Sequence, residues 1–118
     1  MVFIEAPAFT RHVGYYLSDA EYAELQAFLA DYPGTGNVMP GTGGFRKMRW
    51  SDSKRGKGKS GGLRIIYFFF EEDEQIWLLT LYDKGEMSDL TENQKQALCN
   101  AIETEKRARR LGRKQGGH

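Results

Sequence analysis

Hydrophobic and polar positions alternate along the middle of the chain with a period of two, which predicts strands. In the segment 45–50, every second residue faces the same side: Phe45, Lys47 and Arg49 face one side, and Arg46, Met48 and Trp50 the other. The unbroken apolar run at 63–70 indicates a strand that is buried on both faces. The acidic residues 71–74 form its turn, and 75–82 is the antiparallel partner.

Apolar residues at three- and four-residue spacing predict an amphipathic helix at 19–32, which Ser18 and Glu21 begin as a capping box. Thr91 and Gln94 form a second capping box. In the helix that follows, we expect four residues to face the core: Ala97, Leu98, Ala101 and Ile102.

The remaining segments complete the order β-α-α-β-β-β-α. We expect a short strand at 2–5, a weak helix at 9–17, and loops at 33–44 and 51–60. The whole chain, 1–118, is predicted to be one α+β domain, a small antiparallel sheet with helices packed on one face. Its basic end, from about 107 to 118, is predicted to be a disordered tail.

Composition narrows the class of protein. With 118 residues and 40% hydrophobic positions, the chain needs no disulfide to fold, and the lone Cys99 suits a reducing compartment. The start of the chain does not read as a signal peptide, and the longest apolar run, Ile65 to Phe70, is far too short to cross a membrane. We therefore expect a cytoplasmic protein with no membrane partner.

Charge is strongly segregated although the net charge is only +1. Residues 46–64 hold eight cations against one acid, Asp52. Glycines and strand-like residues interrupt this run, so several of the cations are held close to backbone.

Two kinds of site are excluded by spacing. Gly58-Lys59-Ser60 resembles the end of a phosphate-binding P-loop, but Ser53 stands where that loop needs glycine. His12, His118 and Cys99 have no metal-ligand spacing to one another, so we expect neither a metal nor another cofactor.

A cluster that suits phosphate remains. If the predicted strands are adjacent, five residues converge at one side of the sheet: Lys47, Arg49, Arg64, Tyr82 and Lys84. Four further cations lie on the loop between them and are expected to bind RNA: Lys54, Arg55, Lys57 and Lys59. The other interpretations are a cross-strand ion pair for Arg64 and a tyrosine at the edge of the core for Tyr82.

The sequence resembles the RelE superfamily, and within it the HigB type. These proteins are the toxins of type II toxin–antitoxin pairs. The resemblance spans about residues 2–105 and is most specific at 41–90. There, Lys-x-Arg at 47–49 is followed by Gly-x-Arg-Ile-Ile-Tyr at 62–67.

The resemblance implies an mRNA endonuclease that acts on the 70S ribosome and its mRNA, by attack of an RNA 2′-hydroxyl that leaves a cyclic phosphate. By position, Lys47 and Arg49 match the family's Lys-x-Lys strand, Arg64 matches its central arginine, and Lys84 lies beside its late-strand arginine. A HigA-like helix-turn-helix antitoxin is the implied partner.

The chain departs from the family near residue 91. Members such as RelE have a catalytic tyrosine there, and this chain has Thr91. Tyr82, a lysine of lowered pKa and Glu86 are the candidate general bases. Two other functions stay open: a non-catalytic RNA- or ribosome-binding module, and a ParE-like toxin of the same fold that inhibits DNA gyrase.

Overall fold

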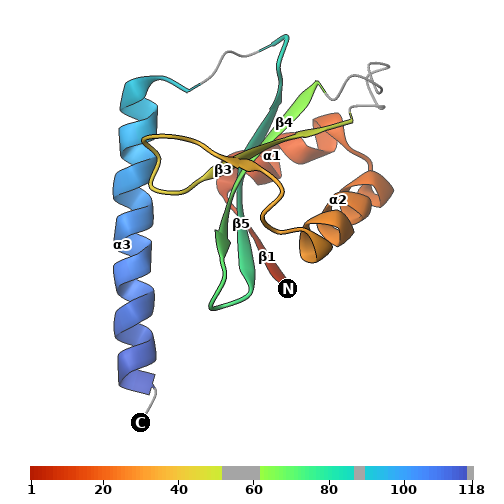
Figure 1. Ribbon diagram of the computed structural model, residues 1–118. Coiled ribbons are helices and arrows are strands. Elements are labelled where there is room, and N and C mark those ends of the chain that lie inside the picture. Colours follow the sequence, from red (N-terminus) through yellow and green to blue (C-terminus); the bar gives the residue numbers. More distant parts are fainter. Residues whose placement is uncertain (52–61, 87–89, 117–118) are drawn as a thin grey trace. The chain divides into compact units, whose positions relative to one another are not determined.

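Strands and helices follow one another much as the sequence predicts, in a computed structural model that describes residues 1–51, 62–86 and 90–116 (Figure 1). The elements are β1 (Val2–Glu5), α1 (Pro7–Tyr16), α2 (Asp19–Asp31), β2 (Asn37–Val38), β3 (Arg46–Trp50), β4 (Leu63–Phe70), β5 (Gln75–Asp83) and α3 (Glu92–Gly116). The predicted α+β class is confirmed.

The chain divides into two compact units. One unit comprises 1–38 and 45–88 and contains all five strands with α1 and α2. The other comprises 39–44 and 89–118 and contains α3. That the two act as one domain stays a prediction.

The sheet of the first unit has the order β1-β5-β4-β3-β2. It is mixed, and the prediction of an antiparallel sheet is wrong at one edge, because β1 pairs with β5 in parallel. A parallel pair needs a long connection between its strands, and here most of the sheet lies between them in sequence. The structure also adds β2, which lies inside 33–44, the segment expected to be a loop. This strand pairs with Arg46 and Lys47 of β3.

One face of this sheet packs against α1 and α2 (Figure 1). Phe9 of α1 and Leu25 of α2 are fully buried with Ile65 and Leu78 of the central strands. On β4 the residues of the other face, Ile66 among them, are also mostly buried, so the prediction that this strand is covered on both faces is confirmed. Burial on both sides fixes β4 as the rigid centre of the unit.

The pairing of β4 with β5 contains a bulge. Ile66 lies opposite Thr80 and Tyr67 lies opposite Leu78, so Leu79 has no partner on β4. An extra residue shifts the alternation of faces by one position along β5.

Both predicted capping boxes are present. The Ser18 hydroxyl accepts from the Glu21 N–H at 3.1 Å while the Glu21 carboxylate accepts from the Ser18 N–H at 2.8 Å. Thr91 and Gln94 make the same reciprocal bonds, at 2.8 and 3.1 Å, and begin α3.

The second unit differs from expectation in two respects. Of the four residues expected to turn inward, Ala97 and Ala101 are exposed, and only Ile102 is fully buried. The helix also continues to Gly116, past the predicted start of the tail near Arg107. Ion pairs one turn apart support it there, such as Arg109 Nε to Glu105 Oε2 at 2.8 Å.

Gly43 lies against this helix. A Cβ built on it would lie 2.7 Å from Ile102 Cγ2, and its carbonyl accepts from Lys106 Nζ at 3.3 Å. Its φ of +79° also favours glycine, so any side chain at this position would push the loop away from the helix.

Glu5, at the end of β1, ties the two helices of the first unit to the sheet. Its carboxylate accepts from the Thr10 hydroxyl at 2.6 Å and from the Tyr22 hydroxyl at 2.7 Å. Burial, and then the bond to Glu5, raises the pKa of Tyr22. Burial also raises the pKa of Tyr67.

Because the pKa values of Tyr22 and Tyr67 are raised, we expect the folded protein to lose stability at alkaline pH. In the unfolded chain they ionise above about pH 10, whereas in the folded protein they keep their protons. Their contribution is therefore complete below about pH 10 and is lost as pH rises further, at up to about 1.4 kcal/mol per pH unit for each group. Denaturant unfolding at a series of pH values should show this slope, and Tyr22→Phe should make it shallower. An unchanged slope in that variant would contradict the assignment.

Candidate functional site

Three of the predicted site residues lie in one row across the sheet. Arg49 of β3 pairs with Arg64 of β4, and Arg64 pairs with Tyr82 of β5. Directly paired residues project from the same face of a sheet, so the three side chains share a face. Lys47 lies two residues before Arg49 on β3 and therefore shares this face as well.

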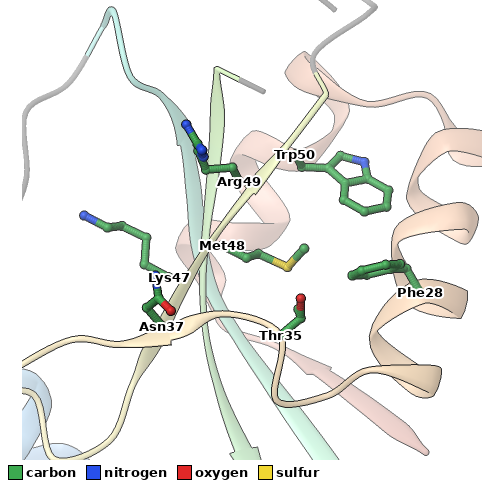
Figure 2. Close-up of a pocket in the computed structure, with 7 residues that line it drawn as sticks. All are labelled: Phe28, Thr35, Asn37, Lys47, Met48, Arg49 and Trp50. Carbon is green, nitrogen blue, oxygen red and sulfur yellow. The ribbon is translucent and has the colours of Figure 1, made fainter. Parts of the chain in front are cut away.

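This face is the one opposite α1 and α2. The neighbours of these residues along the strands, Met48, Leu63 and Leu81 among them, belong to the core on the helical side. Since side chains alternate along a strand, the residues between them point the other way. Figure 2 shows Lys47 and Arg49 on one side of β3, with Met48 and Trp50 on the other. The predicted alternation is confirmed for 47–50.

Lys84 lies at the same end of the sheet. It is the first residue after β5, and its N–H donates to the Gly62 carbonyl at 2.8 Å, just before Arg64. Lys84 is exposed. We call Lys47, Arg49, Arg64 and Lys84 the basic face.

Arg64 is the most firmly held of these cations. Its strand is hydrogen-bonded on both sides, to β3 and to β5. The side chain is half-buried, and its guanidinium lies 3.5 Å from the Leu63 carbonyl oxygen. A planar donor group on a rigid strand presents its N–H groups in a fixed direction.

Arg49 is held less firmly. It is exposed and makes no hydrogen bond or ion pair with the residues that the structure describes. An anion bound between the directly paired Arg49 and Arg64 would contact both guanidinium groups.

Tyr82 and Glu86, two of the candidate bases, differ in exposure. Tyr82 is only 4% exposed. Glu86 is exposed, and its carboxylate accepts from the Tyr16 hydroxyl of α1 at 3.0 Å. Thr91, where the sequence departs from the resemblance, caps α3.

The predicted RNA-binding cations of the loop lie outside the described residues. They are Lys54, Arg55, Lys57 and Lys59.

A pocket that the sequence did not predict adjoins the basic face at the edge of β3 (Figure 2). Its volume is about 240 Å³, and its lining residues are Phe28, Thr35, Asn37, Lys47, Met48, Arg49 and Trp50. They come from α2, from the turn after it, and from β2 and β3. The alternation of 45–50 places Trp50 on the helical side, but no local pattern shows that Phe28 meets it there.

Other classes of site find no support in the described part of the chain. It contains no group of three or more side chains that could hold a metal ion. Within the same residues, no helix has the length and apolar character needed to span a bilayer. No protein-family model matches this sequence.

Proposed function

We propose that this protein is an endoribonuclease of the HigB type, a toxin that cuts mRNA on the ribosome in the cytoplasm and is neutralised by a HigA-like antitoxin. The observation that supports it best is the direct pairing of Arg49 with Arg64 on the face opposite the packed helices. Two guanidinium groups side by side offer several N–H donors to one nucleic-acid phosphate.

The reaction needs positioning, charge stabilisation and a group that takes the 2′-hydroxyl proton. As that proton leaves, the 2′-oxygen of one nucleotide attacks the phosphorus that follows it. The bond from that phosphorus to the 5′-oxygen breaks, the 5′-oxygen takes up a proton, and a cyclic phosphate remains. Arg64 faces the negative charge that develops on the phosphorane, while Arg49, Lys47 and Lys84 hold the flanking phosphates. The ribosome, by holding the mRNA, supplies much of the orientation.

One observation favours a second candidate, a non-catalytic RNA- or ribosome-binding module. A general base must lie within hydrogen-bond reach of the proton it takes, and the phenol of Tyr82 is buried. The Glu86 carboxylate already accepts a hydrogen bond from the Tyr16 hydroxyl. A basic face without an accessible base would bind RNA without cutting it.

A reconstituted translation system separates the two functions. The protein is added to ribosomes that translate a defined mRNA, and primer extension maps new ends, with the naked mRNA as control. We expect new ends in the translated mRNA only. Ribosome binding that weakens steeply with salt, without new ends, would establish the binding module instead. Neither binding nor cleavage would exclude both.

A further inference from the structure

The pocket at the edge of β3 combines aromatic and polar groups. The rings of Phe28 and Trp50 form one wall, with centroids 5.3 Å apart and planes tilted by 54°. Rings this close leave no room for a third ring between them, so a planar ligand would stack on the open face of one of them. Figure 2 shows Thr35 near these rings, and Asn37 beside Lys47.

The polar groups of the pocket are available to a ligand. The side chains of Thr35 and Asn37 are exposed and make no hydrogen bond within the described residues, and the same is true of the Arg49 guanidinium. Backbone groups add to them, because β2 pairs only with Arg46 and Lys47. Among the described residues, Met48–Trp50 therefore have a strand partner only on the β4 side.

The size and the place of the pocket restrict its ligand. About 240 Å³ is less than the range of about 300–1,000 Å³ that holds drug-sized molecules. The pocket shares Arg49 and Lys47 with the basic face. A small planar group attached to a phosphate fits both this volume and these two cations.

We propose that this pocket binds one nucleobase of a single-stranded RNA whose adjacent phosphate lies on the basic face. The base stacks on Trp50 or Phe28, and Asn37 and Thr35 donate to and accept from its edge. Asn suits this role because its amide carries both donors and an acceptor. Single-stranded RNA is commonly recognised by such stacking combined with hydrogen bonds to the splayed base. This assignment rests on the proposed function, since it names the part of the RNA that the site reads.

An extended peptide that adds a strand to β3 is a different occupant, and the structure favours it less. The open edge is three residues long, Met48–Trp50, whereas strands are usually about five or six residues. Four of the lining residues have polar or charged side chains that a base with its phosphate uses and an apolar peptide does not: Thr35, Asn37, Lys47 and Arg49.

Fluorescence of Trp50 tests the proposal directly. In a Trp77→Phe background Trp50 is the only tryptophan. The probes are trinucleotides with 2′-O-methyl sugars, which cannot be cut, with each base in turn, and an abasic trinucleotide of the same charge. We expect the base-containing probes to quench Trp50 and to bind about five- to a hundredfold more tightly than the abasic one.

Substitution at Asn37 tests the reading of the base. Asn37→Ala should reduce the differences among the four bases while leaving the affinity for the abasic probe unchanged. Asn93→Ala, an exposed asparagine on α3, is the matched control and should alter neither. Because Asn37 is exposed, its variant tests the pocket without removing a core side chain.

Each outcome decides the question. Equal binding of the abasic probe overturns the base pocket and leaves the proposed function standing, because phosphate contacts alone would explain it. Absence of quenching by any trinucleotide at millimolar concentration, or quenching only by an added extended peptide, also overturns it. Base-dependent quenching by a protein that fails to cut mRNA supports the pocket and excludes the nuclease.

Discussion

Replacing Arg64 by alanine should reduce mRNA cleavage on the ribosome on the order of a hundredfold, about 3 kcal/mol of transition-state stabilisation. Arg64 lies on the central strand between β3 and β5, so its guanidinium starts from a fixed backbone. The phosphorane carries more negative charge than the phosphate it forms from, and a preorganised donor stabilises it selectively. Single-turnover cleavage with saturating protein measures the effect.

Binding to ribosomes should decrease much less in the same variant, because Lys47, Arg49 and Lys84 remain. Arg64→Lys should restore only part of the activity, since it keeps the charge but loses the bidentate geometry. Arg11→Ala is the matched control: it removes one exposed arginine from α1, which packs on the other face of the sheet. A melting temperature measured on the same preparations separates catalysis from folding. A destabilised but fully active Arg64→Ala protein would show that Arg64 is only structural.

Replacing Tyr67 by phenylalanine should destabilise the fold by about 2 kcal/mol, through a single hydroxyl. The Tyr67 ring is fully buried, and its hydroxyl donates to the Pro33 carbonyl at 2.8 Å and accepts from the Gly36 N–H at 2.9 Å. Phenylalanine would leave the buried Gly36 N–H without its acceptor, which costs about 1–3 kcal/mol.

Denaturant unfolding at neutral pH measures this loss, and Tyr32→Phe is its control. Tyr32 is 60% exposed, so removal of its hydroxyl should change the free energy of unfolding by less than about 0.5 kcal/mol. Equal effects in the two variants would mean that the hydrogen bonds of the Tyr67 hydroxyl to Pro33 and Gly36 do not stabilise the fold. The Tyr67 variant should also weaken the binding of any ligand in the pocket, because the lining residues Thr35 and Asn37 flank Gly36.

Local features of the sequence predicted local structure well. The apolar run predicted β4 with the bounds that the structure has, and both capping boxes begin their helices at the predicted residues. In each case the signal and the structure lie within a few residues of each other, so no distant contact decides the outcome.

Features that depend on distant contacts were missed. Nothing in residues 2–5 shows that β1 joins the sheet beside β5, and the two residues of β2 are too few for a periodic pattern. Ala97 and Ala101 have the spacing of an inward face, but both are exposed. The less exposed face of the helix includes Lys95 and Cys99, which are half-buried. Small apolar residues specify a helical face weakly, because their burial gains little free energy.

The candidate site was predicted in part for the same reason. Alternation showed that Lys47 and Arg49 share a face, because that property belongs to one strand. The row that joins Arg49, Arg64 and Tyr82 depends on the register between three strands, and alternation does not encode register.

The unpaired Leu79 divides β5 into two segments of opposite phase. Before it, Ile76 and Leu78 belong to the core, and after it Leu81 does, while Tyr82 lies beside Arg64. If Leu79 instead paired with Ile66, Leu81 would take the place of Tyr82 opposite Arg64, and the tyrosine would turn toward the helices. Removal of Leu79 would keep the pairs on both sides of the bulge, because Thr80 would then follow Leu78 directly. Homologues that keep the basic face are therefore free to vary this residue or to lack it, but not to pair it with β4.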